Sequence, residues 1–181
     1  IKSRRTIRKF KDEKIPEEVK NEIFEAATWA PSHRNEQPWE FHVVGKETRE
    51  KLLKLYQSVA EKMMQMPDIP EPAKKFMANL KEDFGGAPLM FAILSKPGDD
   101  ELHDRENDLA VGTAVQNMCL TAWDRGIGSV WLTVGSTPPA REMLKVPEGY
   151  KVISLIAMGY PDEEPAAPPR IDYHDKTKHL P

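Results

Sequence analysis

The residues best suited to chemistry begin the chain, where Arg4-Arg5-Thr6-Ile7-Arg8 places three guanidinium groups and a hydroxyl within five positions. Guanidinium groups match phosphate oxygens in pairs and keep their charge at any working pH. The 181-residue chain carries a formal net charge of -3, so it has no general attraction for nucleic acid or anionic membranes. The run therefore predicts a site for a small phosphorylated ligand, with a solvated basic terminus as the alternative.

A second group of polar side chains lies between two prolines, Pro31 and Pro38, which restrict the backbone. This stretch offers a hydroxyl, an imidazole, a guanidinium and two side-chain amides, on Ser32, His33, Arg34, Asn35 and Gln37. Amides carry donor and acceptor together, so a rigid loop of this kind can recognise the edge of a heterocycle. The alternative is a loop that caps the preceding helix and anchors Trp39, which we expect to pack rather than to react.

Gly126 and Gly128 do not form a dinucleotide-binding fingerprint. That fingerprint follows a strand and opens a helix, whereas this pair closes a helix and opens a strand. The glycines instead indicate a helix C-cap and a tight turn that exposes backbone N–H groups. On the preceding apolar helix, Gln116 and Asn117 need hydrogen-bond partners if they are buried, and structural pairing is the expected answer.

The remaining reactive side chains predict no further site. Asp172, His174, Asp175 and His179 are metal-ligand types, but no framework holds them together, so we predict no metal. The only cysteine, Cys119, excludes an internal disulfide and favours a reducing compartment. No apolar run approaches the roughly 20 residues that span a bilayer, and the first residues lack a signal peptide's apolar stretch. We therefore expect a cytoplasmic protein.

Hydrophobic periodicity predicts the elements that position these groups. No repeat or linker divides the chain, and Leu89–Leu94 is an unbroken apolar run typical of a buried strand. The methionines around position 64 are either core filler or part of a lid. Helices are predicted over 16–30, 52–63, 73–82 and 104–125 and after Pro138-Pro139, and strands over 41–44, 89–94, 129–133 and 152–158.

The helix over 104–125 is apolar or small on nearly all sides between Leu109 and Ala122, which predicts burial on most sides. Small residues such as Gly112 allow another backbone to approach closely. Either a second subunit covers one face, or the chain wraps this helix by itself. The proline-rich tail from Pro161 shows little periodicity, which leaves an arm across a partner and simple disorder as alternatives.

Taken together, these motifs resemble the nitroreductase family over nearly the whole chain, in order and at the right spacings. The short length and the Pro-x-His pattern are similar to the compact members of that family. The likeness is carried by Arg4-Arg5-Thr6-x-Arg8-x-Phe10, Pro31-Ser32-x-x-Asn35-x-Gln37-Pro38-Trp39, Gly112-x-Ala114-x-Gln116-Asn117-x-x-Leu120-x-Ala122, Gly126-x-Gly128-x-x-Trp131 and Gly159-Tyr160-Pro161.

The resemblance implies an α+β fold, a three-layer sandwich whose mostly antiparallel central sheet is flanked by helices. It implies one FMN-binding domain over residues 1–181, with 161–181 as an extended C-terminal arm exchanged in an intertwined homodimer. The implied enzyme passes a hydride from NADH or NADPH through FMN to a small electrophilic acceptor, such as a nitroaromatic or a quinone, by a ping-pong mechanism. Reductive dehalogenation, flavin fragmentation and a non-enzymatic FMN-binding module are the alternatives.

The resemblance also implies which residues meet the flavin. Arg4, Arg5, Thr6 and Arg8 fall on the motif that meets its phosphate and ribityl chain, and Arg170 on the C-terminal basic position that reaches the phosphate. The loop residues Pro31, Ser32, His33, Asn35 and Gln37 fall on the motif that meets the same flavin from the other subunit, and Trp131, Leu132 and Thr133 on the strand over the ring. No residue is assigned as an obligatory catalyst. His33, which stands where serine is often found, is the candidate proton donor or substrate contact.

Overall fold

A four-stranded antiparallel sheet forms the centre of the structure, a computed structural model that describes residues 1–181. The strands lie in the order β1-β2-β4-β3, so β2 and β4 are central and β1 and β3 are the edges. All residues of β2 are buried, as the unbroken apolar run predicts. The bounds are Trp39–Val43 for β1, Leu89–Ser95 for β2, Gly128–Leu132 for β3 and Lys151–Gly159 for β4.

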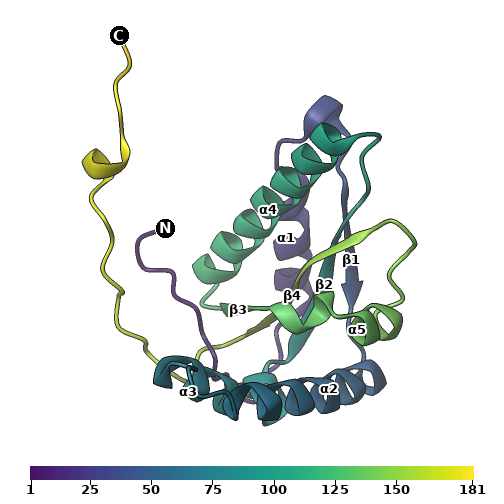
Figure 1. The fold of residues 1–181 in the computed structure, drawn as a ribbon, viewed down its shortest axis with the longest axis vertical. Helices are drawn as coiled ribbons and strands as arrows, with labels where there is room; N and C mark the ends of the chain where they lie inside the picture. The colour runs from purple at the N-terminus through teal and green to yellow at the C-terminus, as the bar shows by residue number, and fades with distance from the viewer.

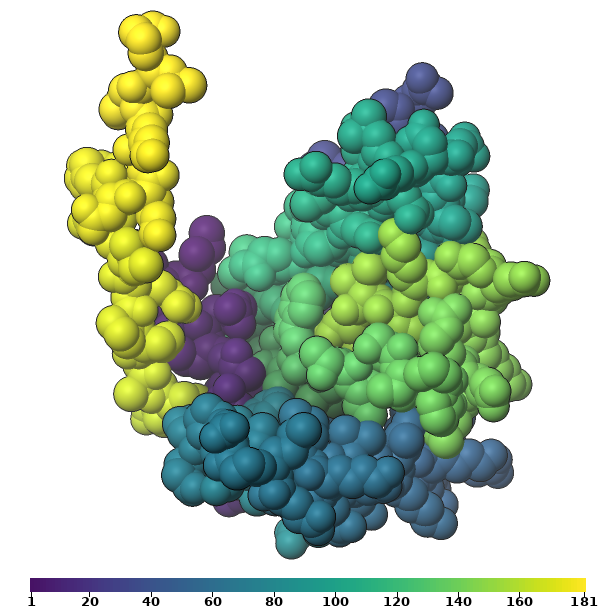
Figure 2. All heavy atoms as spheres, viewed as in Figure 1, coloured from purple at the N-terminus to yellow at the C-terminus, as the bar shows by residue number.

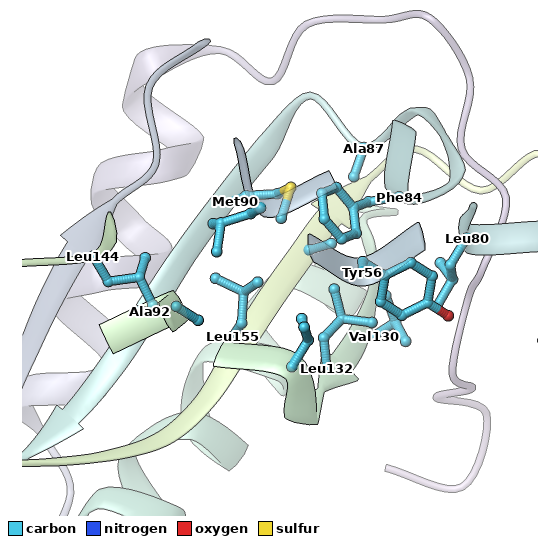
Figure 3. Close-up of a cluster of buried hydrophobic side chains, with 14 of the residues drawn as sticks. Tyr56, Leu80, Phe84, Ala87, Met90, Ala92, Val130, Leu132, Leu144 and Leu155 are labelled. Atoms are coloured by element: carbon cyan, nitrogen blue, oxygen red, sulfur yellow. The ribbon is translucent and has the colours of Figure 1, made fainter. Parts of the chain in front are cut away.

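Helices cover both faces of this sheet (Figure 1). Side chains alternate along β2, so Phe91 contributes to the hydrophobic cluster on one face and Met90 to the cluster on the other. Helices α1 (Glu17–Thr28) and α4 (Glu101–Asp124) pack on the first face. Helices α2 (Lys46–Met64), α3 (Glu71–Leu80) and α5 (Pro138–Met143) pack on the second, whose core Figure 3 shows. The predicted three-layer α+β sandwich is confirmed.

Several element boundaries differ from the prediction. Helix α1 begins one residue after Pro16, which is its N-cap, and β1 begins already at Trp39. Helix α2 begins at Lys46, six residues before the predicted start at Leu52. The prediction missed these first turns because their residues are mostly charged and show no apolar periodicity. The four short 3₁₀ helices, at His33–Asn35, Asp83–Gly86, Thr133–Ser136 and Tyr173–Lys176, were not predicted. No helix is long and apolar enough to cross a membrane.

Helix α4 is buried on one side only. Val115, Met118 and Ala122 are fully buried, whereas Leu109 is 63% exposed and Gln116 is also exposed. The chain therefore does not wrap this helix on all sides, and that alternative is wrong. An exposed stripe remains along the helix, in which leucines alternate with polar residues: Leu102, Arg105, Leu109, Thr113 and Gln116.

The N-terminal segment and the residues after β4 lie against each other at the β3 edge of the sheet. Thr6 bridges Ser129 of β3, and Phe10 bridges Pro161. The amide of Ile7 donates to the carbonyl of Ser129 at 3.0 Å, which fixes the segment on the edge strand. Beyond this contact the chain continues as an extended arm that stands away from the body of the protein (Figures 1 and 2).

His42 on β1 joins the sheet to the end of α5 through both of its ring nitrogens. Its Nδ1 lies 2.7 Å from the carbonyl oxygen of Leu144, and its Nε2 lies 2.7 Å from a carboxylate oxygen of Glu40. Both partners only accept hydrogen bonds, so both ring nitrogens have to donate. Burial opposes the charge, but the bonds to Glu40 and Leu144 outweigh it and raise the pKa of His42 above its ordinary value.

We predict that His42→Gln lowers the free energy of unfolding by about 1.5–3 kcal/mol at about pH 5.5, the range for hydrogen bonds that involve a charged group. Because the pKa is raised in the folded state, this stabilisation is complete below the unfolded pKa of about 6.5 and is lost as the pH rises through the folded-state pKa. Urea unfolding of both proteins at about pH 5.5 and 8.5 measures the difference. A difference that stays constant with pH would contradict the assignment.

Candidate functional site

Four arginines line one pocket of about 240 Å³, called here the arginine pocket. Three come from the N-terminal segment and the fourth, Arg170, comes from the C-terminal arm. Figure 2 shows this arm alongside the N-terminal segment. The structure therefore brings together five residues that the sequence grouped around a phosphate. The lining residues are Arg4, Arg5, Thr6, Arg8, Pro165, Ala166, Pro168 and Arg170.

No carboxylate of the protein neutralises these four guanidinium groups. The ion pairs that involve arginine are those of Arg49 with Asp83 and Arg125 with Glu22. The nearby carboxylate of Glu163 accepts hydrogen bonds from the backbone amides of Arg8 and Lys9. The arginine pocket thus concentrates positive charge in a chain that is mildly acidic as a whole.

Arg8 holds a donor that the protein does not satisfy. Its Nε is buried and has no hydrogen-bond partner, although buried polar groups are almost always paired. Arg5 differs, because its Nη1 donates to the carbonyl oxygens of Lys2 and Arg4 at 2.8 and 2.9 Å. The pocket therefore lacks an acceptor beside Arg8, and an anionic oxygen would supply it.

Two glycines allow the arginine segment to approach the sheet. A Cβ atom on Gly85, whose φ is +75°, would overlap the carbonyl oxygen of Arg8. A Cβ atom on Gly128 would overlap the side chain of Ile7, a buried residue that directly precedes Arg8 in the sequence. Gly128 therefore serves close packing and not a turn, whereas Gly126, with φ +74° just after α4, is the predicted C-cap glycine.

A second pocket, of about 270 Å³, lies between α2, α3 and the end of β3 and is called here the α2–α3 pocket. Its walls are mostly apolar, and the Arg8 guanidinium stacks on the Phe76 ring at 5.0 Å from the centroid. Arg8 and Phe76 thus connect the two pockets. The predicted ring contacts lie here, among the lining residues Tyr56, Val59, Ala60, Met63, Ala73, Phe76, Met77, Trp131, Leu132, Thr133, Val134 and Thr137.

The loop between the two prolines lies elsewhere, at the end of the molecule where α4 begins (Figure 1). Pro31, Ser32 and His33 line a third pocket of about 310 Å³ together with residues of α4 that include Glu106. Asn35 and Gln37 are exposed and line neither this pocket nor the arginine pocket. One protomer therefore does not unite the predicted loop residues with the predicted phosphate residues.

The backbone of this loop is strained. Arg34, Asn35 and Gln37 have φ values of 48°, 58° and 50°, in the left-handed region that residues other than glycine rarely adopt. The Ser32 hydroxyl accepts a hydrogen bond from the Gln37 amide at 3.0 Å and helps to hold this shape. Strain of this kind clusters at functional sites, where the surroundings impose it.

Two histidine–carboxylate pairs beside the loop were not predicted from the sequence. His33 Nδ1 lies 3.1 Å from Glu106, and the neighbouring His103 Nε2 lies 2.8 Å from Glu36. The sequence also treated Tyr56 and Phe76 as ordinary helix positions, because no motif connects them with β3. Asn117 is paired as expected, donating to a backbone carbonyl of α1 at 3.2 Å, whereas Gln116 is exposed.

The fold places two connected pockets, one lined by arginines and one mostly apolar, at the edge of an antiparallel sheet. The model of the Nitroreductase family matches residues 1–160. The Bacillus subtilis protein YfhC, provisionally named an NAD(P)H nitroreductase, is 30% identical over 99% of this chain and 92% of its own. The chain therefore belongs to the nitroreductase family.

Solved structures agree with this assignment. A nitroreductase-like protein from Bacillus cereus matches with a TM-score of 0.79 and 25% identity, covering 99% of this chain and 92% of the other. An FMN-dependent nitroreductase from Clostridium difficile matches with a TM-score of 0.69 and 30% identity, covering 99% and 95%. Relatives named iodotyrosine deiodinase and 5,6-dimethylbenzimidazole synthase also match, so the similarity extends beyond proteins named as nitroreductases.

We predict that Gly85→Ala destabilises the protein more than Gly126→Ala does. Both glycines have positive φ, but a Cβ atom meets nothing within 4 Å at Gly126 and overlaps the Arg8 backbone at Gly85. Backbone strain alone costs about 1–2 kcal/mol, and the overlap adds about 1–3 kcal/mol. Urea unfolding measures both variants, and equal losses of stability would show that the Arg8 segment yields freely.

Proposed function

We propose that this chain is an FMN-dependent oxidoreductase that uses NADH or NADPH to reduce a small electrophilic acceptor, such as a nitroaromatic or a quinone. The observation that carries the proposal is the arginine pocket, where Arg8 Nε is buried without an acceptor. The names of the relatives support the same cofactor and electron donors. The single cysteine, Cys119, is consistent with the reducing cytoplasm as the site of action.

The arginine pocket fits the phosphate end of FMN. Arg4, Arg8 and Arg170 would direct paired N–H groups at phosphate oxygens, and the Thr6 hydroxyl would add a donor. Arg5 would contribute mainly charge, because part of its guanidinium already bonds to backbone carbonyls. Concentrated positive charge of this kind favours a dianionic phosphate over neutral ligands of the same size.

The segment Trp131–Thr133 and the α2–α3 pocket fit the ring end of the same cofactor, because Arg8 of the arginine pocket contacts Phe76, which lines the α2–α3 pocket. When bound, FMN supplies a ring that accepts a hydride from NAD(P)H and returns two electrons to an oxidised acceptor. β3 is an edge strand, so some of its backbone N–H groups face away from β4 and can stabilise negative charge on a neighbouring ring. Donor and acceptor would use one open face in turn, which gives ping-pong kinetics.

A second protomer completes the site in this proposal. Helix α4 has 24 residues and is therefore about 36 Å long, with the loop pocket near its start and the N-terminal segment near its end. The latter contact is made by Trp123 Nε1, which donates to Ser3 Oγ at 3.0 Å. Two α4 helices that pair antiparallel about a two-fold axis through their exposed stripes would bring the loop of one chain beside the arginine pocket of the other.

The second protomer would contact both the loop and the C-terminal arm. Pro31, Ser32, Asn35 and Gln37 would meet the flavin across the interface, which supplies a reason for the strained loop backbone. His33, paired with Glu106, stays the candidate proton donor or substrate contact. The arm carries exposed apolar residues, Ile171 at 65% and Leu180 at 86%, that a partner surface would cover.

The experiment that tests this function is a spectroscopic titration. Purified protein reconstituted with FMN should show the absorption of oxidised flavin, and anaerobic addition of NADH or NADPH should bleach it. An added quinone or nitroaromatic should then restore the absorption. Protein that binds no FMN would refute the proposal, and bound FMN that neither nicotinamide reduces would favour a non-enzymatic binding module.

We predict that Arg8→Ala weakens FMN binding by about 1.5–3 kcal/mol, the range for a hydrogen bond to a charged group. Arg141→Ala on α5, which removes the same charge outside the pocket, should leave the affinity unchanged.

Asn35→Gly, which keeps the positive φ and removes the amide, should weaken FMN binding at the site of the partner chain. Heterodimers of Arg8→Ala with Asn35→Gly chains, isolated with two tags, should regain one tight site per dimer. If they bind no better than either homodimer, the shared site is wrong.

A further inference from the structure

Tyr56 carries the polar atom of the α2–α3 pocket that the protein leaves unsatisfied. The residue is 7% exposed, and its hydroxyl is buried without a hydrogen-bond partner. Figure 3 shows the ring among hydrophobic side chains, including Leu80, Phe84 and Val130. The Phe84 ring lies 5.6 Å away between centroids, so the tyrosine ring itself is well packed.

A phenylalanine would fill the same space without the hydroxyl. Buried tyrosine hydroxyls usually find a partner, because an unsatisfied polar group loses its bonds to water and gains none in return. Burial also raises the pKa of Tyr56 to about 12, so the hydroxyl stays protonated at working pH. The position thus keeps a neutral hydrogen-bond donor ready beside an apolar pocket.

The walls of the pocket suit a flat aromatic ligand. Phe76 and Trp131 offer aromatic surface, and Trp131 is 43% exposed. Met63 and Met77 line the same pocket, and unbranched methionine side chains can adjust so that a ligand atom reaches a buried group. A mostly apolar pocket with a buried donor that has no partner in the protein discriminates in favour of a ring that carries an acceptor oxygen.

We propose that the Tyr56 hydroxyl donates a hydrogen bond to a carbonyl oxygen of a planar aromatic ring bound in the α2–α3 pocket. The inference rests on the proposed function, which offers two sources of that chemistry: the ring of FMN and a quinone acceptor. Tyr56 is then a positioning residue that selects oxygen-bearing rings.

The test compares Tyr56→Phe with the wild type and with Tyr150→Phe, a matched control at a partly buried tyrosine that does not line the pocket. Oxidised, FMN-loaded protein is titrated with 1,4-naphthoquinone and with naphthalene, which has a similar shape but no oxygen. No nicotinamide is present, so the quinone is not consumed. FMN affinity and the flavin absorption spectrum are measured separately, and FMN binding by the wild type tests the proposed function independently.

We expect Tyr56→Phe to lose affinity by about three- to tenfold, the effect of one neutral hydrogen bond. If Tyr56→Phe loses affinity for naphthoquinone but not for naphthalene, the ligand of the Tyr56 hydroxyl is the electron acceptor. A loss of FMN affinity with a shifted flavin spectrum identifies the cofactor ring. Both results support the proposal, and Tyr150→Phe should reproduce neither.

Thermal stability separates this role from a structural one. Tyr56→Phe removes an unsatisfied buried hydroxyl, so the unliganded variant should melt at the same temperature as the wild type or higher. A lower melting temperature with unchanged affinities would show that the hydroxyl bonds within the protein. Unchanged affinities for the quinone and FMN overturn the proposal at any melting temperature.

Discussion

The structure depends most on a concentration of positive charge that the protein itself does not neutralise. Four guanidinium groups converge on one pocket in an acidic chain, and no carboxylate pairs with any of them. Like charges at this density repel each other unless an anion lies between them. Two glycines, Gly85 and Gly128, leave the space that the arginine segment occupies, because a Cβ atom at either position would overlap it. An anion bound in this pocket would therefore stabilise the region.

The sheet and helices serve this pocket and the apolar one beside it. The buried strands β2 and β4 form a rigid centre, while the edge strand β3 carries both the N-terminal segment and the wall of the α2–α3 pocket. The contact between Arg8 and Phe76 connects charge with apolar surface. A ligand with an anionic end and an aromatic end matches this pair of pockets better than a ligand that has only one of the two.

The apolar run predicted the buried strand β2 because that signal is local. The three layers and the grouping of Arg170 with the N-terminal arginines were implied by the family resemblance, because Arg170 is far from them in the chain. The structure places these residues on one pocket, and their role toward a phosphate stays a prediction. The pairing of His33 with Glu106, the cavity at Tyr56 and the contact of Arg8 with Phe76 join residues far apart in the chain, so no spacing rule contains them. The left-handed conformation of Arg34 and Gln37 could not be predicted either, because neither residue type favours it.

The position of Arg170 has a consequence for the biosynthesis of the protein. The pocket takes its first arginines from the beginning of the chain and its last from the arm near the end. The ribosome synthesises these segments far apart in time, and closing so long a loop costs conformational entropy. The sheet itself needs β4, which lies between β2 and β3, and Arg170 follows β4 in the chain. The complete anion pocket can therefore assemble only after all four strands have been synthesised. In the proposed function, tight capture of the cofactor follows formation of the sheet.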